Sequence, residues 1–215
     1  GIVDYIASKG KPVLLASGAS TIKEVDIAMT ILTNHTDEIV LMQCNTNYTA
    51  SLENFKYINL NVLKEYKRRY PNTILGLSDH TPGHATVLGA VALGARVIEK
   101  HFTDDTTREG PDHKFSMDFD TWKNMVDRTR ELENSLGLEI KKVEDNEKET
   151  VVLQRRAIRA KKDLIVGDII CEDDLEFLRP CPKDALSPYD LEKIINKEIV
   201  SSIESGDYIK WKNLK

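Results

Sequence analysis

The chain has 215 residues, of which 40% are hydrophobic and 30% are charged, a balance typical of a globular protein. Its net charge of −5 argues against a nucleic-acid partner, because phosphate binding requires a surplus of lysine and arginine. No apolar run approaches the ~20 residues that span a bilayer, so we expect no membrane-embedded segment.

The first residue and the cysteines of the chain lead to two further expectations. The chain begins at Gly1 without methionine, inside the expected helix IVDYIASKG, so we expect that residues preceding it have been removed. The three cysteines, Cys44, Cys171 and Cys181, have no C-x-x-C spacing and are odd in number. They indicate reduced thiols, and we expect a cytoplasmic location.

The first 137 residues alternate between short apolar segments and segments with helical spacing. The apolar segments are residues 12–17, 38–44, 73–79 and 96–102, and the helical segments are 21–35, 52–70, 85–94 and 118–137. Strands that are apolar throughout and separated by helices indicate a parallel sheet that is buried on both faces. Four such units predict an α/β fold that is half of a (β/α)₈ barrel.

In barrels of this kind the functional residues lie on the loops after the carboxyl ends of the strands. All four predicted strand ends are polar, and they carry Ser17-Gly18, Asn45 to Tyr48, Ser78 to His80, and Glu99 to His101. This clustering is the first functional signal in the sequence.

Two of these strand ends carry a histidine, His80 and His101. If the strands are neighbours, the two imidazoles converge at one end of the sheet. Neutral imidazoles are common ligands of Mn, Fe, Co or Zn, and two of them leave positions for water and substrate oxygens. The alternative is that each histidine is only a satisfied polar strand end. Because the two histidines form a matched pair flanked by Asp79 and Glu99, the metal site is the favoured interpretation.

Other polar groups are weaker candidates. Lys100 and Lys114 could bind an anion, and Glu99 could move a proton. The loop GPDHK, residues 110–114, offers Asp112 and His113 to a polyol, although a surface turn explains it equally well. The segments CNTNY and ASGAS, residues 44–48 and 16–20, could contact a phosphate or sugar, or could be ordinary turns.

A change of pattern divides the chain near its middle. Residues 138–150 are charged and lack a sustained apolar face, so they are predicted to be a linker between a half-barrel, residues 1–137, and a second domain. Residues 151–215 contain short alternating segments and a turn at residues 166–168, and the run SPYDLEKIINKEIVSSIESGDYIKWKNL adds a small helix, a strand, a turn and a final strand. This pattern predicts a small β-rich domain.

Three runs in the half-barrel, SDHT, GAVALGARVIEKHFT and GPDHKFSMDF, resemble the signature of the bacterial sialic acid synthases, also called nonulosonate synthases. The tail, with AKKDLIVGDIICEDDLEFLRP and LSPYD, is similar to their C-terminal SAF, or antifreeze-like, domain. The segment from residue 41 to 66 looks most like the legionaminic acid synthase branch. The resemblance covers nearly the whole chain.

The resemblance implies an enzyme that condenses phosphoenolpyruvate with an N-acetylated hexose. The sugar would be N-acetylmannosamine or 2,4-diacetamido-2,4,6-trideoxymannose. The product would be a nine-carbon α-keto acid, sialic or legionaminic acid, released together with phosphate. The resemblance also implies a divalent metal, Mn²⁺ or Mg²⁺, held by His80 and His101.

Roles for individual residues follow only from this resemblance. Glu99 matches the family's glutamate that handles protons near the sugar, and Asp112 matches a sugar-hydroxyl ligand. Arg179 matches an arginine that one subunit offers to the acetamido group in the other subunit's site, which implies a domain-swapped homodimer. Contacts to phosphoenolpyruvate or sugar match Thr46, Tyr48 and Ser78.

Two departures from the family matter. Many relatives have a Ser-Thr-Gly turn where this chain has Ala16-Ser17-Gly18, so a phosphate contact is expected from Ser17 or from backbone N–H groups. The family's first four βα units, which supply lysines for phosphoenolpyruvate, are not in this chain. We therefore expect these residues to hold the metal half of a site and to be inactive alone. The alternatives are a non-catalytic sugar-binding or dimerising module and a metal-dependent class II aldolase.

Overall fold

The computed structural model describes residues 1–49 and 51–215. These residues form two compact units, Gly1–Leu138 and Glu139–Lys215. The predicted linker, residues 138–150, includes a 3-10 turn at Asp145–Glu147 and the start of α6 (Lys148–Gln154). Among the described residues, no helix has both the length and the apolar character that crossing a membrane requires.

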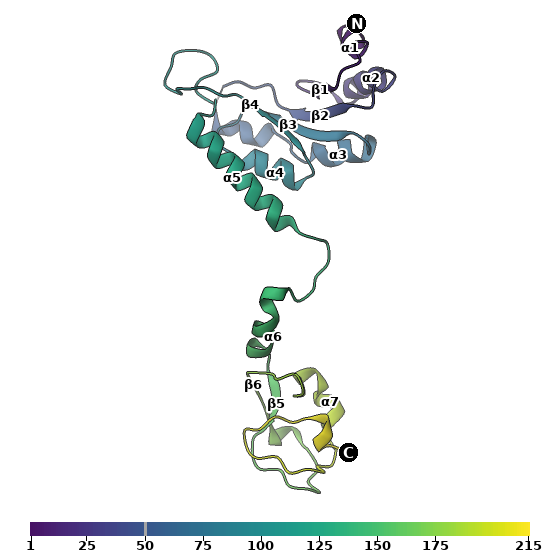
Figure 1. The fold of residues 1–215 in the computed structure, drawn as a ribbon, viewed down its shortest axis with the longest axis vertical. Coiled ribbons are helices and arrows are strands. Elements are labelled where there is room, and N and C mark those ends of the chain that lie inside the picture. Colours follow the sequence, from purple (N-terminus) through teal and green to yellow (C-terminus); the bar gives the residue numbers. More distant parts are fainter. Residues whose placement is uncertain (50) are drawn as a thin grey trace. The chain divides into compact units, whose positions relative to one another are not determined.

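The first unit is built on a four-stranded parallel sheet whose strands follow one another in chain order (Figure 1). The strands are β1 (Val13–Ala16), β2 (Ile39–Cys44), β3 (Ile74–Asp79) and β4 (Val97–Lys100). Each lies inside a predicted apolar segment, so the predicted α/β class is confirmed. Because neighbouring strands are parallel, all four carboxyl ends lie along one edge of the sheet.

Among the described residues, five α-helices accompany the sheet: α1 (Ile2–Ala7), α2 (Ile22–Thr33), α3 (Val62–Arg69), α4 (Ala85–Ala92) and α5 (Phe119–Leu136). Helix α2 begins after Thr21, whose backbone N–H donates to the Glu24 carboxylate at 2.7 Å. Helix α5 begins after Asp118, whose carboxylate accepts from the Thr121 N–H at 2.9 Å. Both contacts satisfy backbone donors that the first helical turn leaves free.

The predicted helix over residues 52–70 is two separate elements in the structure. A 3-10 helix, Leu52–Tyr57, precedes α3, and the chain turns between them at Asn59, which has a φ of 49°. Asparagine tolerates this left-handed conformation better than most residues do. The apolar spacing continues across the turn, which is why the sequence pattern suggested one helix.

The core of the first unit lies on one face of the sheet. Leu41, Leu75 and Leu77 alternate along β2 and β3 and pack with buried residues of α2, α3, α4 and α5 (Figure 1). The opposite face is only partly covered among the described residues of this unit, because Leu14 is 54% exposed and Ile74 is 51% exposed, whereas Met42 on the same face is buried. The prediction of a sheet buried on both faces therefore holds only in part for the described residues of this unit. A continuous apolar strand does not reveal which of its faces is covered.

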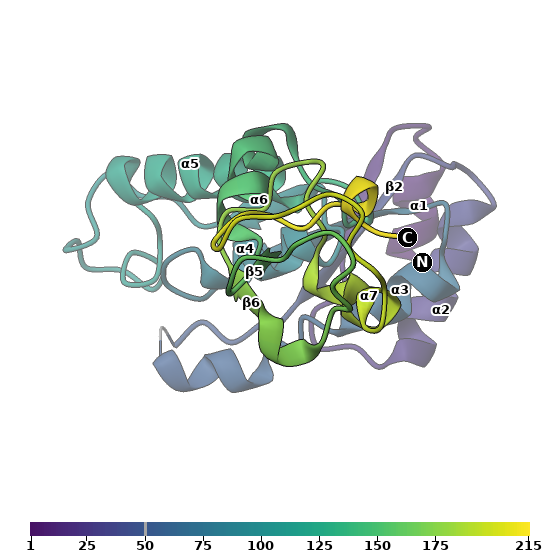
Figure 2. The same ribbon diagram turned by 90° about the horizontal axis from the view of Figure 1, so that it is seen from below.

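In the second unit, long extended loops surround a small antiparallel pair of strands, β5 (Ala157–Ala160) and β6 (Leu175–Leu178) (Figure 2). Single bridges such as Leu164↔Ile203 and Ile199↔Leu214 join these loops. The small helix predicted after residue 186 is a 3-10 turn, Pro188–Asp190, followed by α7 (Leu191–Ile194). Isoleucines dominate the core of this unit: Ile158, Ile170, Ile194, Ile199, Ile203 and Ile209.

Candidate functional site

The ends of β3 and β4 bring His80 and His101 together. Their ring centroids are 5.1 Å apart, and the planes are inclined by 62°. Asp79 and Lys100 are the last paired residues of the two strands, so each histidine is the first residue beyond the ladder. The predicted convergence of the two imidazoles is therefore present in the structure.

The surroundings of His80 suit a metal ligand. The ring is buried, and Nδ1 lies 2.9 Å from the Asn45 carbonyl oxygen. A carbonyl can only accept, so Nδ1 carries the proton and Nε2 keeps its lone pair. A hydrogen bond from the other ring nitrogen to a backbone carbonyl is the usual support of a histidine that binds a metal.

His101 is less enclosed, with 29% of its side chain exposed. Its Nδ1 lies 3.7 Å from Asp112 Oδ2, which is too long for a hydrogen bond but places the carboxylate beside the ring. The two imidazoles thus fit a two-nitrogen donor set for a divalent metal. No group of three or more His, Cys, Asp or Glu side chains with metal-binding geometry occurs in residues 1–49 and 51–215.

Two further aromatic rings enclose the histidine pair. The Tyr48 ring lies 4.3 Å from the His80 ring, centroid to centroid, and the Phe115 ring lies 4.9 Å from that of His101. Phe115 is buried, and sequence reasoning did not select it. Its signal was its place directly after GPDHK, but a single phenylalanine in a loop gives no indication of where it packs.

Glu99 and Ser78 form a second polar contact on the same side of the sheet. They are register partners on β3 and β4, and the Ser78 hydroxyl donates to Glu99 Oε1 at 2.7 Å. Ser78 is buried and Glu99 is exposed. Since side chains alternate along a strand, Glu99 lies on the same face of β4 as His101. A carboxylate held in this way can exchange a proton with a group bound near the histidines.

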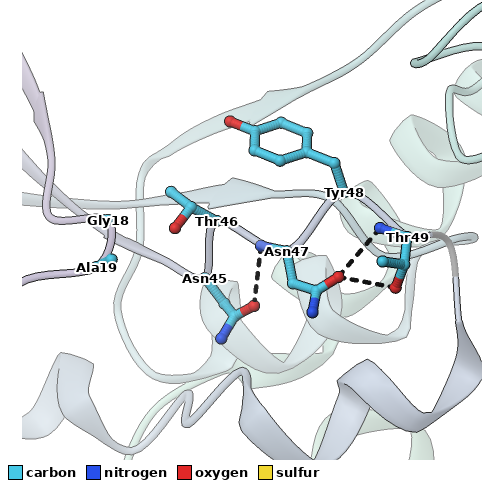
Figure 3. Close-up of a pocket in the computed structure, with 7 residues that line it drawn as sticks. All are labelled: Gly18, Ala19, Asn45, Thr46, Asn47, Tyr48 and Thr49. Atoms are coloured by element: carbon cyan, nitrogen blue, oxygen red, sulfur yellow. Dashed lines mark hydrogen bonds between the residues drawn. The ribbon is translucent and has the colours of Figure 1, made fainter.

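The loop after β2 forms an open pocket of about 410 Å³ (Figure 3). It is lined by Gly18, Ala19, Asn45, Thr46, Asn47, Tyr48 and Thr49. The Asn47 side-chain carbonyl accepts from both the N–H and the hydroxyl of Thr49, while the Tyr48 ring extends to the other side of the loop. The pocket thus presents Thr46 together with Tyr48, whose ring lies against the histidine pair.

Ser17 occupies a different pocket from the histidines. Its hydroxyl donates to the Met42 carbonyl at 3.1 Å, and it lines a space of about 260 Å³ together with Gln43 and Tyr66. Burial raises the pKa of the Tyr66 phenol, and it also raises the pKa of the nearby Cys44 thiol. The structure therefore brings Tyr48, Ser78, Glu99 and Asp112 toward the histidines, places Thr46 in the pocket beside Tyr48, and turns the Ser17 hydroxyl away.

Lys100 cannot bind an anion as the sequence suggested. Its side chain is 1% exposed, and its ammonium group lies 2.6 Å from Asp79 Oδ2. Asp79 and Lys100 lie on the opposite face from His80 and His101, because neighbouring residues of a strand alternate. Lys114 is exposed.

Arg179 belongs to the second unit and is the last residue before Pro180. Its carbonyl accepts from the guanidinium of Arg159 at 3.2 Å. Arg159 also donates to the Gly206 carbonyl at 2.8 Å and stacks on the Tyr208 ring at 4.1 Å. Arg159 thereby fixes the backbone that carries Arg179.

Comparison with protein families gives two matches that together cover most of the chain. The NeuB family model matches residues 1–141, and the SAF domain model matches residues 155–215. Among curated proteins, the chain is 37% identical over 214 residues to the uncharacterised protein MJ1065 of Methanocaldococcus jannaschii, covering 99% of this chain and 62% of that protein. It is 33% identical over 218 residues to the N,N'-diacetyllegionaminic acid synthase of Legionella pneumophila, covering 99% of this chain and 60% of that protein. The chain thus spans about three fifths of the length of these relatives.

Solved structures give a similar picture. The N-acetylneuraminic acid synthetase of Leptospira borgpetersenii, in complex with citrate, is 28% identical, with a TM-score of 0.62 over 70% of this chain and 51% of that one. A spore coat polysaccharide biosynthesis protein E from Chromobacterium violaceum has a TM-score of 0.70 over 100% of this chain and 63% of that one. At 20% identity the latter shows the fold alone.

Proposed function

This chain belongs to the NeuB family, and from that premise we propose that it carries the histidine side of the active site of a nonulosonate synthase. The reaction is the condensation of phosphoenolpyruvate with an N-acetylated hexose, which gives a nine-carbon sialic or legionaminic acid and phosphate. The observation that carries the proposal is the pair His80 and His101, 5.1 Å apart at the ends of adjacent strands. Relatives named as legionaminic, pseudaminic and N-acetylneuraminate-9-phosphate synthases support it.

The proposed metal is Mn²⁺ or Mg²⁺, with His80 and His101 as its protein ligands. When bound, such an ion would polarise the aldehyde oxygen of the open-chain sugar. The hydrogen bond from His80 Nδ1 to the Asn45 carbonyl keeps Nε2 available as a ligand. Tyr48 packs against the His80 ring and the buried Phe115 packs against the His101 ring.

The remaining residues bind the substrates and move a proton. C3 of phosphoenolpyruvate attacks the aldehyde carbon, water adds at C2, and phosphate leaves with cleavage of its bond to C2. The alkoxide that forms from the aldehyde takes up a proton, and Glu99, steadied by Ser78, is placed to control that proton.

Asp112 lies near His101, and its carboxylate is proposed to accept a hydrogen bond from a sugar hydroxyl. Thr46 and Tyr48 line the pocket that we assign to the substrate. Ser17 remains a proposed phosphate contact. Its hydroxyl would have to leave the Met42 carbonyl to make that contact.

Arg179 is proposed to reach the acetamido group of the sugar in the site of a second copy, which makes a domain-swapped homodimer the proposed assembly. The contact from Arg159 supports this role, because it fixes the backbone of Arg179 while the Arg179 side chain stays exposed. We also propose a cytoplasmic location.

The test is the release of inorganic phosphate from phosphoenolpyruvate in the presence of Mn²⁺. This chain is joined for the test to the four preceding βα units of a NeuB relative, because the family's lysines for phosphoenolpyruvate lie there, and the same joined protein serves wherever phosphate release is measured. N-acetylmannosamine and 2,4-diacetamido-2,4,6-trideoxymannose are supplied in separate reactions, and a third reaction replaces phosphoenolpyruvate by pyruvate. We expect phosphate with one sugar and no product from pyruvate. Product from pyruvate would instead support an aldolase. Mn²⁺ binding by the His101→Asn variant at wild-type affinity would contradict the proposed metal site.

A further inference from the structure

Directly behind the histidine pair, on the helix-covered side of the sheet, lies a buried ion pair. The Lys100 ammonium and Asp79 Oδ2 are 2.6 Å apart, and their side chains are 1% and 0% exposed. No other ion pair among the described residues has both partners this deeply buried. The two residues close the ladder between β3 and β4, immediately before His80 and His101.

The Asp79 carboxylate is saturated with hydrogen bonds. Besides Lys100, it accepts from the Thr86 hydroxyl at 2.6 Å and from the Thr81 hydroxyl at 2.9 Å. The backbone N–H of Thr81 also points to Asp79 Oδ1, at 3.2 Å. A buried charge that is paired and fully hydrogen-bonded holds its surroundings in one arrangement, because every alternative leaves a charge or a donor without a partner.

Lys100 also holds the residue on the far side of His80. Its ammonium donates to the Thr81 carbonyl at 2.6 Å, in addition to Asp79. One side chain therefore fixes the residue before and the residue after His80. Because Lys100 is the immediate neighbour of His101, the same contacts set the backbone of one histidine relative to the other.

We propose that Asp79 and Lys100 are positioning residues that set the separation of the His80 and His101 imidazoles for a shared divalent metal. The inference rests on the proposed metal site. Neither residue touches that site, since both side chains lie on the opposite face of the sheet. A buried ion pair adds little net stability compared with apolar residues of the same size, so a geometric role accounts for it better than a stabilising one.

The test compares stability with metal affinity in four variants. Asp79→Asn and Lys100→Met each leave one buried charge alone, and we expect both to be unstable. The double variant Asp79→Asn/Lys100→Met removes both charges while keeping the side-chain volumes. The control is Leu77→Ala, which opens a cavity on the same face of the same strand without touching the pair. Urea unfolding gives the stability, and the electron paramagnetic resonance signal of free Mn²⁺ gives the affinity.

We expect the double variant to be more stable than either single variant, yet to bind Mn²⁺ about tenfold or more weakly than wild type, the loss typical of a support one shell away from a metal. Leu77→Ala should lose stability and keep its Mn²⁺ affinity. The proposal is overturned if the double variant binds Mn²⁺ as wild type does, or if affinity follows stability across all four variants. Absence of Mn²⁺ binding by the wild-type chain would overturn the metal site itself, and this proposal with it.

Discussion

Ser78 and Glu99 face each other across adjacent strands, and the Ser78 hydroxyl holds the Glu99 carboxylate at 2.7 Å. Ser78 is buried while Glu99 is exposed, so the contact ties an exposed carboxylate to a buried hydroxyl. This anchoring keeps Glu99 on the same face as His101, where a proton would be exchanged with the sugar.

The first prediction is that Glu99→Gln lowers kcat for phosphate release by about 10²- to 10⁴-fold, the range expected for loss of a general acid or base. The glutamine oxygen can still accept from Ser78, so the geometry of the strand ends should be kept. Mn²⁺ affinity serves as the control and should stay within about twofold of wild type, because Glu99 is not a proposed ligand. An unchanged kcat would remove Glu99 from the mechanism.

The second prediction concerns the two histidines near the end of β4. His101→Asn should weaken Mn²⁺ binding by at least about a hundredfold, because one of two nitrogen ligands is lost. His113→Asn is the matched control: the His113 ring lies 2.7 Å from the Thr103 hydroxyl and serves the loop rather than the proposed metal. Titration with Mn²⁺ measures both variants, and equal losses would show that His101 acts only through the fold.

The sequence predicted the histidine pair because parallel strands carry their carboxyl ends to one edge. Two polar residues at consecutive strand ends must then lie near each other, whatever the details of the packing. The role of Lys100 could not be predicted in this way. A strand places consecutive residues on opposite faces, and only the structure shows that the helix-covered face takes Lys100 and pairs it with Asp79.

The position of Ser17 shows the same limit. Sequence reasoning placed its hydroxyl among the site residues because it follows β1. In the structure it bonds to the Met42 carbonyl and lines a separate pocket. The split of residues 52–70 into two elements likewise depends on Asn59, whose left-handed conformation is permitted by its side chain but not required by it.

The third prediction tests the one-sided core of the first unit. Leu41 is fully buried beneath the helices, whereas Leu14 is 54% exposed on the other face. Leu41→Ala should reduce the free energy of unfolding by about 2–5 kcal/mol, because it removes buried contacts and leaves a cavity. Leu14→Ala should reduce the free energy of unfolding by less than about 1 kcal/mol. Urea denaturation of both variants measures this, and equal losses would mean that the second face is covered in solution.

The fourth prediction concerns pH and the second unit. The Lys162 ammonium, 2.6 Å away, and Cys171 lower the pKa of the Asp174 carboxyl. A lowered folded pKa means that this carboxyl stabilises the fold above its unfolded pKa of about 3.9, and that the stabilisation is lost as the pH falls through the folded pKa. Asp174→Asn should therefore lower the melting temperature at pH 7 and flatten its decline below about pH 4.

Trp211 fluorescence reports the unfolding of the second unit in this measurement. The chain has two tryptophans, and the other, Trp122, lies in the first unit, so all variants carry Trp122→Phe to remove its signal. The exposed neighbour Asp173 supplies the control, and Asp173→Asn should leave the acid decline as it is in wild type. If the melting temperature of the Asp174→Asn variant falls with pH as steeply as that of the wild type, other groups cause the acid sensitivity.

The fifth prediction tests the proposed exchange of Arg179 between subunits. His101→Asn and Arg179→Ala variants should each be inactive in phosphate release. If Arg179 acts in the partner's site, a mixed dimer has one complete site, made of His101 from the Arg179→Ala subunit and Arg179 from the His101→Asn subunit. Random mixing then restores about one quarter of wild-type activity, since half of the dimers are mixed and each has one working site of two. If Arg179 acts within its own subunit, no mixed dimer has a complete site, and mixing restores nothing. The measurement is phosphate release after the two variants are unfolded and refolded together, with each variant refolded alone as the control.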